Sequence, residues 1–254
     1  MAAARSVDML PVRDNPQSIS PAARTISLAF SQDPLIEWLR PNAIPWGSLS
    51  RETCKWQYRR IQQAILDGIV LSSPPLKQMV EVFPPRAKSL VAAVEEPLSQ
   101  TANEESLDAG IAMLLFPPQS CAKWTIKRIL LACKLWALDF LDPATDSETC
   151  ERRVDTLLTS HDIMMDEIRA RYAVDDVWYL EVLAVHPLLQ SRGMGSKSMQ
   201  WLLEYVDNSP IFLECTSERN VKFYERWGFE VVEEVELGEE ERVTLWVMLR
   251  PTQP

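Results

Sequence analysis

Histidine is nearly absent from this sequence, which has only His161 and His186 among its 254 residues. Two histidines far apart in the chain form no zinc cluster, and no nucleophile elbow accompanies them. The five cysteines are odd in number and scattered, without metal-ligand spacing. This pattern predicts no metal site and favours a reducing, cytoplasmic location.

Basic residues are outnumbered, with 26 Lys and Arg against 36 Asp and Glu and a net charge of −10. Nucleic acids and anionic membranes usually bind a basic patch, so we expect neither partner. Long apolar runs are missing too, since the most apolar stretch, residues 126–141, is too short to span a bilayer. Charged residues interrupt it at Lys127, Arg128, Lys134 and Asp139. The first residues lack an apolar segment of signal-peptide length, which supports the expectation of a cytoplasmic protein.

Glycine is scarce as well, yet three of the seven glycines stand at positions 193, 195 and 228. Residues 179–185 form an apolar, β-branched run, which predicts a buried strand, and apolar residues recur at helical spacing after residue 195. In the loop between them, Gly193 and Gly195 let backbone N–H groups approach a ligand without a Cβ in the way. The start of the helix adds unpaired N–H groups and a positive dipole end, so this loop predicts a phosphate site.

A dinucleotide-binding Rossmann motif is the first alternative, because Glu214 follows the first glycine by about 20 residues, where a ribose-binding acid belongs. However, Ser198 stands where that motif has its third glycine, and the loop before the first glycine is too long. Too little chain follows for a doubly wound domain. We therefore set this alternative aside.

Two motifs together resemble the GNAT superfamily of acyl-CoA-dependent N-acyltransferases. The first is Gln190-x-x-Gly193-x-Gly195 after the strand, and the second is NVKFYERWGF at residues 220–229. Within the superfamily, residues 212–229 are similar to the puromycin N-acetyltransferases. The resemblance implies a single α/β domain over residues 1–254, with a mixed central sheet, a splayed strand pair at the acetyl-CoA cleft and flanking helices. It covers about residues 178–250 well, which would form the acetyl-CoA-binding core.

The same resemblance makes acetyl-CoA the co-substrate and implies no metal. The residues it implies in binding are Leu183, Ala184, Val185, Gln190, Ser191, Arg192, Gly193, Met194, Gly195, Ser196 and Asn220. Backbone groups of residues 183–185 are expected to hold the pantetheine arm in the gap between the splayed strands. Residues 190–196 are expected to wrap the pyrophosphate, with Arg192 adding a full positive charge. Asn220 is expected to bind the arm from the other side.

Direct attack of an amine on the thioester needs a proton acceptor and can use a proton donor for the leaving thiolate. Tyr224 occupies the family's tyrosine position and is the expected donor, since a phenol with a pKa near 10 can protonate a thiolate. Glu214 is the expected base because it lies on a strand that enters the cleft. Glu181 is the alternative, with its side chain expected on the same face as Leu183 and Val185. No His-Asp pair of the kind that some acyltransferases use is evident in the sequence.

Two further residues near the motifs receive other roles. His186 precedes Pro187 at the end of the strand, so we expect a structural role or a place near the phosphates. Cys215 stands on a buried strand and is expected to be inert, which favours direct transfer over an acyl-cysteine intermediate.

The first half of the chain predicts the opening helices and strands of such a domain. We expect helices at residues 20–31 and 50–67, strands at 7–12, 69–72, 79–83 and 90–94, and an exposed linker at 97–105. Trp38 and Trp46 are candidate walls of the acceptor pocket, or simply core residues. Residues 107–172 are expected to be mostly helical, an elaboration that serves as a cap over the acceptor site, as scaffolding or as a dimer surface. If the elaboration is a cap, replacing Trp124 or Trp136 with alanine should change the affinity for the acceptor.

The second half predicts strands at residues 211–215, 229–237 and 243–249 and a helix at 220–227. The whole pattern predicts an N-acetyltransferase that acts on the amine of a small molecule, as a monomer or a homodimer. A protein N-acetyltransferase remains an alternative within the class. A regulatory or scaffold protein that binds acyl-CoA without turnover remains an alternative outside it.

Overall fold

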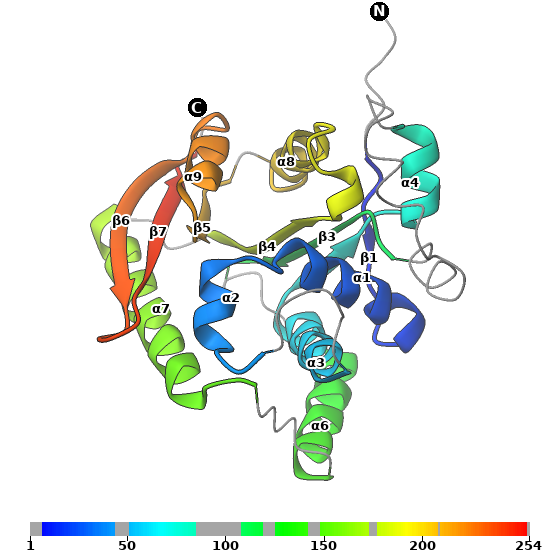
Figure 1. Ribbon diagram of the computed structural model, residues 1–254, viewed down its shortest axis with the longest axis horizontal. Helices are drawn as coiled ribbons and strands as arrows, with labels where there is room; N and C mark the ends of the chain where they lie inside the picture. The colour runs from blue at the N-terminus through cyan, green and yellow to red at the C-terminus, as the bar shows by residue number, and fades with distance from the viewer. Residues whose placement is uncertain are drawn as a thin grey trace, which may run out of the picture.

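The computed structural model describes residues 7–43, 51–84, 108–118, 125–141, 148–172, 177–207 and 209–252. Over these ranges the chain builds a seven-stranded sheet in the order β1-β2-β3-β4-β5-β7-β6 (Figure 1). The strands are β1 Leu10–Pro11, β2 Ile69–Ser72, β3 Ile111–Phe116, β4 Trp178–Val185, β5 Ile211–Cys215, β6 Glu230–Leu237 and β7 Val243–Arg250. Neighbouring strands are antiparallel except β4 and β5, which are parallel.

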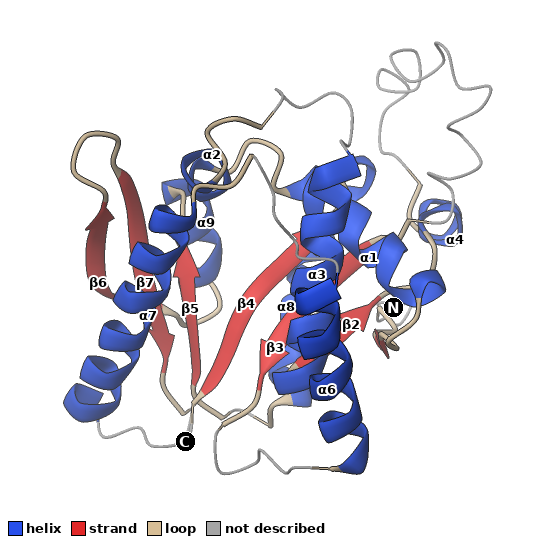
Figure 2. Cartoon of the chain, turned by 90° about the horizontal axis from the view of Figure 1, so that it is seen from below, coloured by secondary structure: helices blue, strands red, loops and turns tan. Residues whose placement is uncertain are grey.

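Helices cover both faces of this sheet (Figures 1 and 2). They are α1 Pro16–Ala29, α2 Pro34–Leu39, α3 Arg51–Asp67, α4 Leu76–Val82, α6 Ile126–Leu141, α7 Glu151–Tyr172, the short 3-10 helix η3 Pro187–Leu189, α8 Met194–Tyr205 and α9 Glu218–Glu225. Helices α8 and α9 lie on one face, whereas α1, α3 and α7 lie on the other. The fold is therefore a three-layer α/β arrangement, as the sequence predicted.

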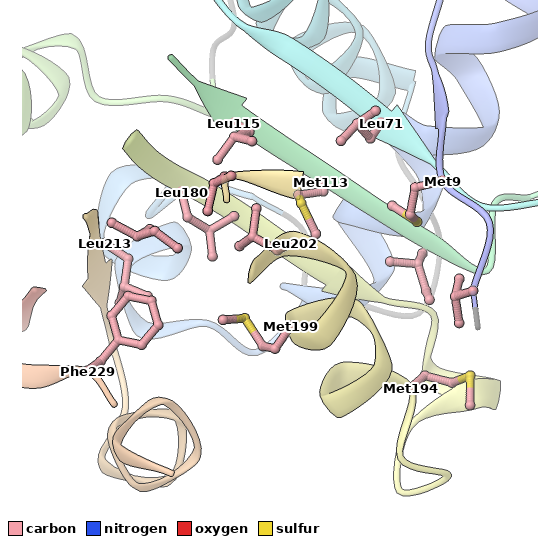
Figure 3. Packing of buried hydrophobic residues seen from close by; sticks show 14 of the residues in the cluster. Met9, Leu71, Met113, Leu115, Leu180, Met194, Met199, Leu202, Leu213 and Phe229 are labelled. Carbon is pink, nitrogen blue, oxygen red and sulfur yellow. The ribbon is translucent and has the colours of Figure 1, made fainter. Parts of the chain in front are cut away.

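The core beneath α8 is built from side chains that alternate along the central strands. Leu202 of α8 points toward Met113 of β3 and Leu180 of β4, whereas Met199 of α8 points toward Phe229 (Figure 3). All five side chains are at least 98% buried. On the opposite face, Val182 packs in a second cluster with residues of α1 and α3. Different helices cover the two faces of the sheet. The face to which a side chain of β4 points therefore decides which helices it packs against.

The splayed strand pair expected from the resemblance is present. Strands β4 and β5 pair only through Trp178↔Ile211, Tyr179↔Phe212 and Leu180↔Leu213. Beyond Leu180, β4 continues to Val185 without a β5 partner, so the main chain of residues 181–185 borders a gap in the sheet. An added strand-like ligand can use backbone groups left free in this way.

A β-bulge in β4 corrects the predicted orientation of Glu181. Against β3, Leu114 pairs with Val182 but Leu115 pairs with Leu180, so Glu181 is the extra residue. An extra residue interrupts the alternation of side chains. Glu181 therefore shares a face with Val182 and contacts Arg60 of α3, whereas Leu183 packs in the cluster beneath α8. The prediction that Glu181 and Leu183 share a face is wrong.

Two predicted segments of the first half are also corrected. Residues 79–83, predicted as a strand, lie mainly in helix α4, which follows Pro75. Residues 111–116, predicted within the helical elaboration, form strand β3 near the middle of the sheet. The sequence Ile-Ala-Met-Leu-Leu-Phe is buried on both faces, so it lacks the alternation that identifies a strand.

Smaller differences concern element ends, and some predictions fall outside the described residues. Helix α1 begins at Pro16 rather than near residue 20, because the Asn15 side chain caps it by accepting the Ser18 N–H at 3.0 Å. The first strand is shorter than the predicted 7–12. The predicted strand at 90–94, the linker at 97–105, Trp46 and Trp124 lie outside the described residues.

The elaboration between β3 and β4 consists of helices α6 and α7. Helix α6 buries Leu135 but presents several large apolar side chains to solvent, with Trp136 76% exposed. Helix α7 packs onto β5 and β7 through Met164, Met165 and Ile168. Of these two helices, α7 is the one whose buried side chains pack against the sheet. Among the described residues, neither helix nor any other is long and apolar enough to cross a membrane.

Candidate active site

A cavity of about 890 Å³ opens beside the gap between β4 and β5. Its walls come from the end of α1, the start of α2, α3, α7, the strands β4 and β5, and α9. The residues on which the chemistry depends are Asp33, Arg60, His161, Tyr179, Glu181, Leu183, Glu214, Asn220 and Tyr224. Both predicted catalytic residues, Glu214 and Tyr224, therefore line one cavity.

Glu214 is held from two sides. Its Oε2 accepts a hydrogen bond from the Tyr179 hydroxyl at 2.8 Å, and its Oε1 lies 3.0 Å from His161 Nδ1. The His161 and Tyr179 rings pack with centroids 4.8 Å apart. The carboxylate is thus fixed in position by one residue of β4 and one of α7.

The histidine in this contact was not found by sequence reasoning. His161 and Glu214 are 53 positions apart, on an inserted helix and a core strand. Burial lowers the pKa of His161, but the hydrogen bond and the charge of Glu214 outweigh it, so the pKa lies above its ordinary value. The sequence analysis considered only a His-Asp pair, whereas the pair that the structure forms is between a histidine and a glutamate. No spacing in the sequence signals a contact that only folding creates.

Tyr224 is placed between aromatic rings at the α9 side of the cavity. Its ring lies edge-to-face against Phe223 and Phe229, with centroids 5.1 and 5.6 Å apart. Burial raises the pKa of Tyr224 further above its ordinary value near 10, and the nearby Cys215 adds to this. The phenol therefore keeps its proton over the physiological pH range, as a proton donor must.

Glu181, the alternative base, is occupied by Arg60. Its Oε1 accepts hydrogen bonds from both Nε and Nη2 of that guanidinium, at 2.9 and 2.5 Å. Arg60 also lies near Asp33, whose pKa is raised by burial despite hydrogen bonds from Thr216 and two backbone N–H groups. A carboxylate paired in this way is a poor proton acceptor.

The glycine loop has the geometry of an anion site. Gly193 caps α8 in the left-handed conformation, with φ 76°, and a Cβ added there would meet nothing within 4 Å. The space above Gly193 is therefore open for a ligand that approaches the start of a 12-residue helix. Ser191, Gly193 and Ser196 are exposed around it.

Other residues implied in cofactor binding are engaged within the protein. Gln190 Nε2 donates to the Val185 carbonyl at 3.1 Å, and Arg192 Nη1 donates to the Phe83 carbonyl at 2.8 Å. Met194 and Ala184 are buried in the core, so only their backbone groups can face a ligand. The bond to Phe83 holds one nitrogen of the Arg192 guanidinium within the protein.

The remaining candidates are structural. His186 is 4% exposed, and its Nδ1 accepts the Leu188 N–H at 3.3 Å as the cap of η3. Burial raises the pKa of Cys215 to about 11, which keeps the thiol protonated and inert. Trp38 is buried and donates its Nε1–H to the Glu241 carbonyl at 2.8 Å, so it is a core residue rather than a wall of the cavity. No cluster of metal-ligating side chains occurs within the described ranges.

The chain is similar to one known protein family and to several solved structures. Residues 165–229 match the model of the Acetyltransferase (GNAT) family. A solved structure described as histone acetyltransferase HPA2 and related acetyltransferase, from Corynebacterium glutamicum, is 14% identical with a TM-score of 0.56 over 98% of both chains. Arylalkylamine N-acetyltransferase 2 from Aedes aegypti is 10% identical, with a TM-score of 0.54 over 98% of this chain and 100% of that one.

At these identities the structural likeness establishes the fold alone. A mixed sheet with a splayed β4–β5 pair, closed by a glycine loop at the start of α8, is the fold of GNAT acetyltransferases. The chain carries a GNAT acetyltransferase family domain, and the family resemblance drawn from the two sequence motifs is confirmed.

Proposed function

We propose that this protein transfers the acetyl group of acetyl-CoA to the amine of a small molecule, by direct attack within a ternary complex. The observation that carries the proposal is that one strand, β4, links the two halves of the site. Leu183 lines the cavity, and the same strand leads through η3 to the open glycine loop. A thioester held along the gap would present its carbonyl to the cavity.

The size and charge of the cavity favour a small cationic acceptor. Cavities of about 300–1,000 Å³ hold drug-sized ligands, and this one measures about 890 Å³. Its walls carry the carboxylates of Asp33, Asp67, Asp162, Asp166, Glu181 and Glu214, against the guanidinium groups of Arg60, Arg128 and Arg169. An excess of carboxylates attracts an alkylammonium ion. The arylalkylamine acceptor in the name of one structural relative is of this kind.

The proposed roles follow from position. Leu183, Ala184 and Val185 bind the pantetheine arm through the main chain, residues 190–196 bind the pyrophosphate, and Asn220 closes the arm from α9. Glu214, alone or together with a side chain that it contacts, takes the proton from the amine. Tyr224 protonates the leaving thiolate. A near relation to the puromycin N-acetyltransferases, and a cytoplasmic location, stay predictions.

The first experiment measures the midpoint of thermal unfolding with and without acetyl-CoA, because it needs no knowledge of the acceptor. A ligand that binds only the folded state adds about 2.7 kcal/mol to its stability at 100 times the dissociation constant. An upward shift supports the cofactor site, and release of free thiol from acetyl-CoA with a panel of amines then tests turnover. No shift at millimolar acetyl-CoA would contradict the proposal. Binding without turnover on any amine would favour the regulatory or scaffold alternative.

A further inference from the structure

The inserted helix α7 brings a nitrogen base to the proposed acceptor site. Met164, Met165 and Ile168 anchor the helix to β5 and β7. His161 lies on the same helix, lines the cavity and keeps 22% of its side chain exposed. Its ring is therefore fixed by packing while part of it stays open to the cavity.

Hydrogen bonding decides which ring nitrogen is free. An ionised carboxylate only accepts hydrogen bonds, so His161 Nδ1, at 3.0 Å from Glu214 Oε1, must carry the proton. In neutral imidazole the other nitrogen, Nε2, then holds the lone pair. The second oxygen of Glu214 already accepts the Tyr179 hydroxyl at 2.8 Å. Each oxygen of the carboxylate is thus already engaged by a protein donor, whereas the imidazole keeps an unprotonated nitrogen.

The charged groups around His161 raise its pKa above that of an ordinary imidazole. The groups that act on its charge are Glu214 from β5, Asp162 from α7 itself and Glu181 from β4. Tyr179 of β4, Arg60 of α3 and Asp166 of α7 line the same cavity. Glu214, and more weakly Asp162 and Glu181, favour the protonated ring and oppose the effect of burial. A base with a pKa close to the working pH transfers protons most effectively.

We propose that His161 Nε2 takes the proton from the attacking amine, and that Glu214 orients the imidazole and stabilises the imidazolium. This inference rests on the proposed acetyl transfer. The amine nitrogen forms a bond to the thioester carbonyl carbon and loses a proton to Nε2. The C–S bond then breaks, and the thiolate takes the Tyr224 proton. Solvent removes the proton from His161 and restores the one on Tyr224. The relation of His161 to Glu214 is that of the base to its carboxylate in hydrolytic triads.

The test compares the pH dependence of kcat/KM in two variants. In the wild type, activity rises with pH as His161 loses its proton, at a pKa above 6.5. His161→Gln should lower kcat/KM by about 10²–10⁴-fold and remove this rise. Glu214→Gln should keep a weakened rise that moves to lower pH, because burial then lowers the pKa of an unpaired imidazole. Ile163→Gln places the same side chain at a solvent-exposed position of α7 and should leave the profile unchanged.

A second measurement does not depend on turnover. The chain has only two histidines, so NMR titration of their ring protons resolves each of them in untagged protein. The His161 signal should titrate above 6.5 in the wild type and below it in Glu214→Gln. The His186 signal should titrate near pH 4 in both.

The outcomes separate the two proposals. If the wild type transfers acetyl groups and His161→Gln keeps its turnover and pH profile, His161 is not the base and the inference is overturned. If the pKa of His161 does not respond to Glu214→Gln, the orienting role is overturned. A wild type that neither binds acetyl-CoA nor acetylates any amine overturns the proposed function, and the inference with it, whatever the titration gives.

Discussion

The ring of Phe223 lies directly over Gly195, so that a Cβ at that glycine would stand 3.3 Å from Phe223 Cζ. Gly195 is the second residue of α8, and Phe223 lies on α9, within the second sequence motif. The two sequence motifs, at residues 190–195 and 220–229, are therefore adjacent in the structure. Gly195 is needed for helix packing, whereas the space over Gly193 is open. The two glycines of the loop thus have different physical roles.

This difference leads to a prediction for Gly193→Ala. Because φ is 76° at this position, an alanine should destabilise the protein by about 1–2 kcal/mol. Its Cβ enters the open space over the loop, so acetyl-CoA should raise the unfolding midpoint less than in the wild type. Thermal unfolding with and without acetyl-CoA separates the two effects. Gly228→Ala imposes similar strain, with φ 81°, outside the loop and should keep the full ligand shift. Equal ligand shifts in all three proteins would mean that the loop does not bind the cofactor.

Tyr224→Phe should lower kcat by about 10²–10⁴-fold if the phenol protonates the thiolate. The phenylalanine keeps the edge-to-face contacts with Phe223 and Phe229, so the unfolding midpoint and the binding of acetyl-CoA should stay close to those of the wild type. Steady-state release of free thiol measures the effect. Unchanged kcat in the folded variant would assign Tyr224 to packing alone.

Glu181→Gln should affect stability more than the pH profile. The change removes the charge that pairs with the half-buried Arg60, whose hydrogen bonds to a charged partner are each worth about 1.5–3 kcal/mol. Denaturant unfolding measures this loss, expected at about 1–3 kcal/mol. The rise of kcat/KM with pH should survive, because the base lies elsewhere. Its disappearance would instead make Glu181 the base and remove both Glu214 and His161 from that role.

His186 should make the protein less stable in mild acid. Burial, and then the charge of Arg24, lower its pKa from 6.5 to about 4 in the folded state. The unfolded chain therefore binds a proton at His186 between those values while the folded chain does not. Stability from this residue is full above pH 6.5 and falls by about 3 kcal/mol as the pH drops to 4.

His186→Asn isolates this contribution from the carboxylates that titrate in the same range. Asparagine is a good cap, so it can replace Nδ1 as the acceptor of the Leu188 N–H at the start of η3. Between pH 6.5 and 4 the variant should lose less stability than the wild type in urea unfolding. Parallel losses in the two proteins would show that His186 does not carry the pH dependence.

The second half of the fold follows closely from the sequence. Local patterns predicted a strand at residues 179–185 and a helix after residue 195. Strand β4 and helix α8 begin within two residues of these positions. Here the apolar periodicity agrees with the elements, and the glycines mark the turn between them. Strand β3 was missed because a strand buried on both faces shows no period of two, and helix α4 because its short apolar run fits either element.

The candidate site was predictable only in part, for a physical reason. Tyr224 and Glu214 stand inside or beside a motif, so a local pattern could identify them. The bulge at Glu181 depends on the register between β3 and β4, and the contact of His161 with Glu214 depends on how α7 lies on the sheet. Register and helix placement are set by contacts between distant segments, which no local spacing encodes. Glu181 was for this reason placed on the wrong face, and His161 was left without a role.

In the sequence, α7 comes between β3 and β4. The proposed acceptor site and the proposed acetyl-CoA site therefore draw on separate parts of the chain. The glycine loop and the β4–β5 gap belong to the continuous core from Trp178 onward, whereas His161 arrives on a segment that enters and leaves at one edge of that core. A helix of different sequence in the same place can present another side chain to Glu214 without altering the three residue pairs that define the gap. Under the proposed function, selection of the acceptor and binding of the acetyl donor therefore depend on different parts of the chain. Under the same proposal, helix α7 is the part to exchange when a different amine is the intended acceptor.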